Sequence, residues 1–349
     1  MDIQESDEPN PGFPINELPI LMIQSTLKKL KPLDVMKYAT CSENCLDNVK
    51  SIYYRTPVEL NVKLRNNPSV TFELRTEENQ DEDFIIISHR DKYWRNDRAM
   101  YSCIYGQTIP IVESSRQRNW LDSAKTNKMV TFWEDPQEGF FKMGRLITDA
   151  FNIVTIDHIL FSNESHEERV RAVEWMKSKG LSTVNSCGIH FEESSNDNAI
   201  NYILANIQIS TELLIDITKA SRNAILNIPE DLESLKILSY SKKNPSLREL
   251  ERMISFNCKT LDFVFSFTLK DIVDFVTKCL DMEYPRLTRF EVETEDGFEL
   301  HFIAQKIDRP KTGSSLYGFR FERSDGKIVT IQKWDWMNFR LRVDDGTGN

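Results

Sequence analysis

Between residues 13 and 54, apolar positions recur at helical spacing in three short runs, which predicts three short helices. The first run follows Leu18-Pro19, where proline suits the first turn of a helix because its missing N–H would have been unpaired anyway. Pro32 ends that helix, and Asp34 is placed to complement the start of the second. Three short helices cannot bury this much apolar surface among themselves, so the excess must face a partner or the rest of the chain.

The next hundred residues change from helical spacing to alternation. Residues 57–64 and 69–75 alternate polar and apolar positions, which predicts two half-buried strands. Asn66-Asn67-Pro68 lies between them, so an antiparallel hairpin is expected. The other predictions here are strands at 84–88 and 99–105, an exposed acidic loop at 77–83, and mainly helix and loop at 113–144.

From about residue 152 onward, short apolar strands alternate with amphipathic helices. The strands recur about every 22 to 30 residues, the range of leucine-rich-repeat units, in which each strand and its helix stack on a neighbour. A parallel, right-handed stack is expected. Ser324-Asp325-Gly326 separates two alternating runs at the end, which predicts a closing antiparallel hairpin. The predicted strands are 153–156, 183–185, 213–217, 234–238, 261–265 and 287–292, and the predicted helices are 165–179, 197–206, 246–257 and 268–281.

Composition narrows the classes of function. The 349 residues allow about two domains, and a hydrophobic fraction of 40% is enough to fill their cores. A net charge of -10 argues against a general binder of nucleic acid or anionic membranes. The sequence has no apolar run long enough to span a bilayer, and its first twelve residues lack the apolar run of a secretory signal. Six scattered cysteines without a Cys-x-x-Cys pair indicate reduced thiols, and hence the cytoplasm or the nucleus.

Candidate catalytic and metal sites are weak. Cys187 and His190 would be neighbours only on a helix, and they fall in a run that predicts strand and loop. Cys41 and Cys45 would share a helix face, but the sequence offers no further ligands nearby for a structural zinc. The chain also lacks a glycine-rich phosphate loop. We therefore expect no catalysis, no metal and no cofactor.

The helical segment resembles an F-box, the adaptor-binding module of cullin-based ubiquitin ligases, in its nematode form. The resemblance is carried by Phe13-Pro14, Leu18-Pro19, Leu30 with residues 32–35, Cys41-Ser42 and Val49-Lys50. It implies that the segment binds a Skp-type adaptor and, through it, a cullin. The adaptor-binding residues that it implies are Leu18, Pro19, Ile23, Leu27, Leu30, Pro32, Leu33, Asp34 and Val35.

The second half resembles the nematode F-box-associated domain of the second type. The motifs follow in the family's order: Asn227-Ile228-Pro229, Phe256 to Lys259, Leu269-Lys270-Asp271, Tyr284 to Leu287, and Arg323 to Ile331. The family implies a subunit that recruits a protein substrate, while other subunits transfer the ubiquitin.

Together these patterns predict an α+β chain with an F-box at 12–55, a connecting region with a β-hairpin at 56–150, and a degenerate leucine-rich-repeat-like domain at 151–345. We expect a non-catalytic substrate receptor with an unknown protein target. A free-standing interaction scaffold is the alternative. Tyr317, Trp334 and Trp336 are candidate target-binding residues, although both tryptophans would face one side of a strand, where a core role is favoured over that of a binding anchor. The acidic balance favours a basic partner.

Overall fold

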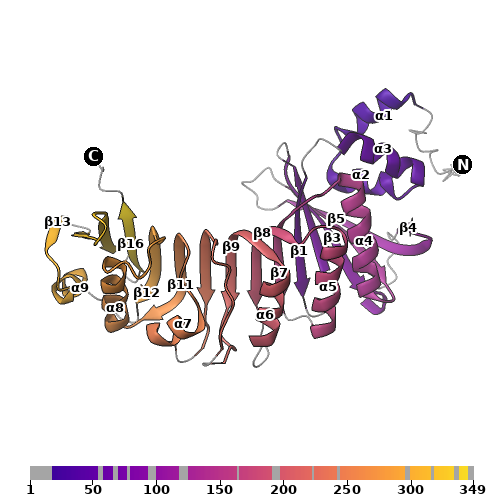
Figure 1. Ribbon diagram of the computed structural model, residues 1–349. Helices are drawn as coiled ribbons and strands as arrows, with labels where there is room; N and C mark the ends of the chain where they lie inside the picture. Colours follow the sequence, from indigo (N-terminus) through magenta and orange to yellow (C-terminus); the bar gives the residue numbers. More distant parts are fainter. Residues whose placement is uncertain are drawn as a thin grey trace, which may run out of the picture. The chain divides into compact units, whose positions relative to one another are not determined.

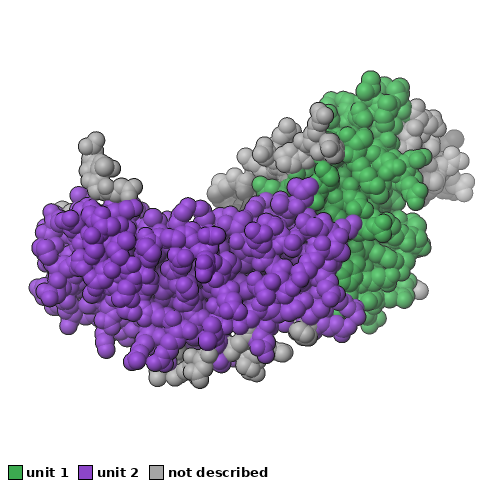
Figure 2. All heavy atoms as spheres, in the orientation of Figure 1, with its two compact units in different colours: residues 1–59, 72–153 green, residues 60–71, 154–349 purple. Residues whose placement is uncertain are grey.

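The computed structural model describes residues 18–53, 58–65, 70–76, 79–92, 100–117, 125–162, 165–190, 197–221, 224–241, 244–294, 299–315, 318–333 and 338–344 (Figure 1). The chain is a mixed α/β protein with parallel and antiparallel strands and a group of three helices near its N-terminal end. It divides into two compact units, residues 1–59 with 72–153 and residues 60–71 with 154–349 (Figure 2). The helical segment and most of the connecting region therefore belong to one unit.

The first unit begins with the three helices that the apolar periodicity predicts. These are α1 (Ile20–Leu27), α2 (Pro32–Ala39) and α3 (Glu43–Tyr53). Pro32 occupies the first turn of α2, where it costs no hydrogen bond. On α3, Tyr53 meets Phe151 of α4 (Pro136–Phe151) edge to face, with ring centroids 5.0 Å apart. This aromatic contact fixes the helical group to the helix that follows the unit's strands.

The strands of the first unit lie in the order β2-β3-β6-β5-β4. Strand β3 runs parallel to β6, whereas β5 is antiparallel to both β6 and β4. Gly139 of α4 lies against the ring of buried Trp133, where a Cβ would come within 2.5 Å of the indole, so only glycine lets the helix approach this closely. The strands are β2 (Val70–Thr76), β3 (Asn79–His89), β4 (Met100–Ile104), β5 (Gln107–Gln117) and β6 (Lys125–Trp133), with a 3-10 turn at Arg90–Lys92.

Two sequence predictions for this unit are wrong. The acidic stretch 77–83 was expected as an exposed loop, but β3 starts at Asn79 and Asp83 is fully buried. Residues 113–144 were expected as mainly helix and loop, yet they contain the end of β5 and all of β6. Polar composition misled both predictions, because a buried carboxylate is tolerated where other elements supply donors. The strands expected at 57–64 and 69–75 form, whereas their Asn66-Asn67-Pro68 connection lies outside the described residues.

The second unit is built on parallel strands. Neighbouring strands from β7 to β12 follow chain order, and β1 pairs with β7. The predicted parallel pairing of these strands is confirmed, although the first strand was placed too early, at 153–156. The strands are β1 (Glu59–Arg65), β7 (Ile156–Ser162), β8 (Thr183–His190), β9 (Gln208–Asp216), β10 (Ser234–Leu238), β11 (Thr260–Phe267) and β12 (Arg289–Thr294).

Helices cover one side of these parallel strands (Figure 1). The covered face is apolar: Leu213, Leu235 and Leu261 lie side by side and are fully buried. Phe275 of α8 stacks on Phe290 of β12 with ring centroids 3.9 Å apart. The helices are α5 (His166–Ser178), α6 (Asp197–Asn206), α7 (Leu247–Met253), α8 (Leu269–Leu280) and α9 (Leu300–Lys306).

Capping explains where several of these helices begin. Ser165 and Ser246 each accept the backbone N–H three residues on, while Glu168 and Glu249 bond back to the serine backbone. Each pair forms a capping box, which satisfies two of the otherwise unpaired N–H groups. Thr268 caps α8 through Asp271 in a related way. The described residues between β9 and β10 contain no helix.

Antiparallel strands close the second unit in the order β12-β16-β15-β14-β13. The predicted hairpin at Ser324-Asp325-Gly326 is confirmed as the turn between β14 and β15, with Gly326 at φ 84°. Asp325 accepts two hydrogen bonds from the buried Arg323 guanidinium, which holds the pKa of Asp325 at about 2. The strands are β13 (Lys311–Ser315), β14 (Gly318–Glu322), β15 (Ile328–Lys333) and β16 (Asn338–Asp344).

Two sequence motifs of the second unit lie just before strands. Arg286 donates hydrogen bonds to the backbone carbonyls of Glu230 and of Asn257, the latter at 3.2 Å, and so ties together the segments before β10, β11 and β12. The backbone adds a further link, since the carbonyl of Lys259 accepts a hydrogen bond from the N–H of Thr288 at 2.8 Å. The motifs from Phe256 to Lys259 and from Tyr284 to Leu287 therefore join successive strand–helix repeats at one edge of the sheet.

Two adjacent leucines test which face is buried. Leu213 faces the helices and Leu214 the open side of the sheet. We expect Leu213→Ala to lower the free energy of unfolding by about 2–5 kcal/mol, because it leaves a cavity. Leu214→Ala should cost less than about 1 kcal/mol. If both variants lost the same free energy of unfolding in urea, the assignment of the two faces would be wrong.

Candidate functional site

Helix α1 exposes apolar side chains on a surface that no other described element covers. Its inner residues, Ile23 and Leu27, are buried, and α1 packs mainly on α3. Three consecutive residues at its start remain in solvent: Ile20 is 49% exposed, Leu21 75% and Met22 53%. Scattered exposed apolar residues are ordinary on a protein surface, but three in sequence on one short helix leave apolar surface around much of its outer side. We call Ile20, Leu21 and Met22 the α1 patch.

The structure divides the adaptor-binding residues that the sequence suggests. Leu18, Pro19, Leu30 and Asp34 are at least partly exposed. The others cannot touch a partner without rearrangement, because they fill the interior of the first unit. These buried residues are Ile23, Leu27, Pro32, Leu33 and Val35.

Sequence reasoning missed two members of the α1 patch, Ile20 and Leu21, and assigned the third, Met22, to the apolar face of the helix. A single apolar face was expected because residues 22, 23, 27 and 30 fit helical spacing. The run Ile20-Leu21-Met22 adds adjacent residues that project about 100° apart around a helix, so they cannot all face inward. That run was the available signal for a second apolar surface.

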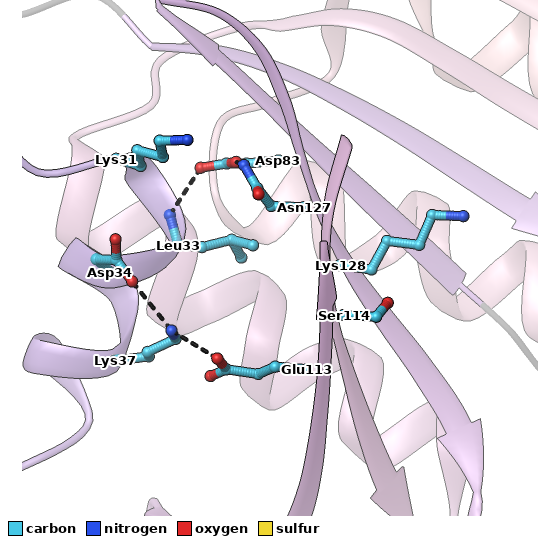
Figure 3. Close-up of a pocket in the computed structure, with 9 residues that line it drawn as sticks. All are labelled: Lys31, Leu33, Asp34, Lys37, Asp83, Glu113, Ser114, Asn127 and Lys128. Carbon is cyan, nitrogen blue, oxygen red and sulfur yellow. Dashed lines mark hydrogen bonds and ion pairs between the residues drawn. The ribbon is translucent and has the colours of Figure 1, made fainter. Parts of the chain in front are cut away.

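A buried carboxylate from β3 holds the start of α2. Asp83 accepts the backbone N–H of Leu33 at 3.0 Å and the side-chain amide of Asn127 at 2.7 Å (Figure 3). The Leu33 N–H belongs to the first turn of α2, where backbone donors lack partners within the helix. Burial raises the pKa of Asp83, while the bonds from Asn127 and Leu33 oppose the rise. The contact therefore stabilises α2 through its hydrogen bonds, since the charge itself is costly to bury.

Lys37 makes a second link between α2 and the strands. Its ammonium lies 3.0 Å from a carboxylate oxygen of Asp34 and 2.8 Å from one of Glu113 on β5 (Figure 3). Burial alone would lower the pKa of Lys37, but the hydrogen bonds to Glu113 and Asp34 outweigh it and leave the pKa raised. The charge is thus fixed, so Lys37 cannot act as a base near neutral pH.

These contacts line a hollow of about 290 Å³ beside α2. Lysines and acids both line the hollow, and two of the acids, Asp83 and Glu113, accept hydrogen bonds from protein donors. Such an arrangement braces a helix against a sheet and leaves neither acid free as a general base. We refer to the Asp83 and Lys37 contacts as the α2 brace.

The residues considered for catalysis or metal binding are not assembled into a site. Cys187 is buried with the core, whereas His190 lies on the opposite, open face of β8. The His190 ring is 2.5 Å from buried Asp216, which also accepts from the hydroxyl and the backbone N–H of Thr218. This network joins the ends of β8 and β9. In the described ranges, no group of three or more His, Cys, Asp and Glu side chains could hold a metal ion.

The candidate target-binding residues Tyr317, Trp334 and Trp336 lie outside the described residues. Cys41 is exposed, and Cys45 is buried with its sulfur 3.1 Å from the Ser42 hydroxyl. Within the part of the chain that the structure describes, no helix is long and apolar enough to cross a membrane.

Comparison with known proteins returned no matching family model, no matching curated protein and no matching solved structure. The functional argument therefore depends on the chemistry of the chain's own surfaces.

Substitutions at Asp83 test the α2 brace. Asp83→Ala leaves the Leu33 N–H and the Asn127 amide without their acceptor, and should cost about 2–3 kcal/mol of unfolding free energy. Asp83→Asn keeps one acceptor and removes the buried charge, so a smaller loss of about 1 kcal/mol is expected. Urea unfolding measures both. Asp47→Ala, at an exposed carboxylate of α3, is the control and should change stability by less than about 0.5 kcal/mol. If Asp83→Ala changed the free energy of unfolding as little as this control does, the α2 brace would not stabilise the first unit.

Proposed function

We propose that this chain is a non-catalytic substrate receptor of a Skp-cullin-F-box ubiquitin ligase. The first three helices serve as a divergent F-box that binds a Skp-type adaptor, which connects the chain to a cullin. The second unit, a degenerate leucine-rich-repeat-like stack of the F-box-associated type, holds an unknown protein target. The chain acts in the cytoplasm or the nucleus, without a cofactor.

The observation that carries this proposal is the α1 patch. Exposed Leu, Ile and Met side chains on a short helix suit a protein interface, where burial of apolar surface contributes most of the affinity. The helix is also well supported, because Ile23 and Leu27 anchor it from below and the α2 brace fixes its neighbour. A pre-organised apolar patch loses little entropy on binding.

The location of the patch alters the expected mode of adaptor binding. Leu33 and Val35 stabilise the fold of the first unit, so the adaptor contacts would come from Ile20, Leu21 and Met22 together with Leu18, Pro19 and Leu30. The helical group would present its first helix to the adaptor and its second to the chain's own strands.

A free-standing interaction scaffold is the second candidate. It is favoured by the burial of Ile23, Leu27, Leu33 and Val35, since a helical group packed into its own unit needs no adaptor to satisfy those residues. In that case the α1 patch would bind some other protein, and the chain would have no role in ubiquitin transfer.

Leu21→Glu separates the two candidates. The side chain is exposed, so the variant should fold as the parent does, while a charge in an apolar interface should cost about 2–4 kcal/mol, or roughly thirty- to a thousand-fold in affinity. Binding of the full chain to a purified Skp-type adaptor is measured by calorimetry. Ser25→Glu adds the same charge to an exposed position of the same helix and is the matched control.

If the Leu21→Glu variant bound the adaptor as tightly as the parent does, the α1 patch would not be part of the adaptor interface. If the parent itself fails to bind the adaptor, the scaffold hypothesis replaces the receptor.

A further inference from the structure

Three arginines lie in one row across four neighbouring strands of the second unit. The pairing registers set Arg289 of β12 opposite Arg342 of β16, Arg342 opposite Thr330 of β15, and Thr330 opposite Arg320 of β14. The next residue along three of these strands points to the other face and is fully buried, namely Phe290, Leu341 and Ile331. Because side chains alternate along a strand, the arginines share the face away from the core. We call Arg289, Arg342 and Arg320 the arginine row.

The members of the row differ in their partners. Arg289 lies 2.7 Å from a Glu291 oxygen, and the same oxygen also pairs with Arg340, the residue opposite Glu291. Arg342 and Arg320 are exposed, and neither forms an ion pair with any residue that the structure describes. Two cations of the row are thus available to a partner.

Acidic residues also lie on this face. Glu322 and Asp344 follow Arg320 and Arg342 by two residues on their strands, about 7 Å farther along. No described ion pair joins them to the arginines. They bound the row on one side and Glu291 bounds it on the other, so the positive charge is confined to a narrow strip across the strands.

The row opposes the stability of the sheet. Like charges directly opposite each other on antiparallel strands repel, and Arg289 faces Arg342 in this way. Glu291 pairs with both Arg289 and Arg340, whereas Arg342 has no ion-pair partner among the residues that the structure describes. A pair of like charges that lowers stability on an exposed face is typical of a surface that binds an anionic partner.

We propose that the arginine row is a docking surface for an acidic segment of a target protein, bound through its carboxylates. Guanidinium groups bind carboxylates with two parallel hydrogen bonds, which suits recognition of individual Asp and Glu side chains. The row spans three strand spacings, about 14 Å, a length that roughly four or five extended residues cover. Acidic residues at every second position place their carboxylates on one side of an extended segment, and three of them span about the length of the row.

The net charge of -10 restricts this docking to short segments. A long polyanion would approach the acidic remainder of the chain, whereas a few carboxylates interact only with the local row within the Debye length of about 8 Å. This inference concerns the target side of the proposed receptor and depends on that function only for its biological role.

The test uses the full chain and a fluorescent peptide of about ten residues, with aspartate at every second central position. A twin peptide with asparagine at those positions is the matched ligand. Anisotropy should show the aspartate peptide binding at least about ten-fold more tightly, with an affinity that falls as salt is added. Arg342→Gln and Arg320→Gln should each weaken binding about three- to ten-fold. Arg252→Gln, at an exposed position on α7, should leave it unchanged.

A second readout distinguishes a docking role from a structural one. Arg342→Gln removes a repulsive charge, so its thermal midpoint should equal or exceed that of the parent. Equal binding of the two peptides, an unchanged affinity in Arg342→Gln, or a lower midpoint in that variant would each overturn the proposal. Adaptor binding is independent of these residues, so its loss or retention reports only on the proposed function.

Discussion

The two-residue period of a strand determines most of the second unit. Each parallel strand commits one face to the helices, and on that face nearly every position from β7 to β12 is apolar and buried. The same period leaves the alternate positions on the open side, where His190, Lys236 and Arg289 lie. A shift of one residue in any strand would exchange these sets, so the buried pattern fixes the register. The polar surface available for binding is therefore a by-product of the core.

A second constraint acts on the backbone at the strand starts. Strands that follow one another in parallel leave their connecting segments side by side at one edge, where peptide groups need partners. Arg286 and the Lys259 backbone supply several of them by bridging successive connections. This explains why short polar motifs recur before apolar strands. They hold each strand–helix repeat at a fixed offset from its neighbour. Hydrogen bonds can do this because they are directional, whereas apolar contacts are not.

The sequence was most informative where periodicity and packing agree. The three N-terminal helices, the parallel strands and the closing turn at Ser324-Asp325-Gly326 could be predicted because local pattern and tertiary burial favour the same structure. It failed at Asp83 and in β6, where polar residues are buried by partners far away in sequence. It also failed to separate the buried from the exposed apolar residues of α1. Periodicity gives the direction of a side chain but not whether a second element covers it, and for α1 that depends on where α3 packs.

The net charge of the sequence likewise does not predict the charge of a local surface. The acidic composition favoured a basic partner, yet the least compensated cations of the described open face lie at its antiparallel end, in a row set by three strand registers. Long-range steering follows the net charge, whereas contact energies follow the few groups within about 4–6 Å. An acidic chain can therefore attract basic proteins at a distance and still bind carboxylates at one strip. Because register sets that strip, its specificity resides in the same hydrogen-bond pattern that holds the sheet together.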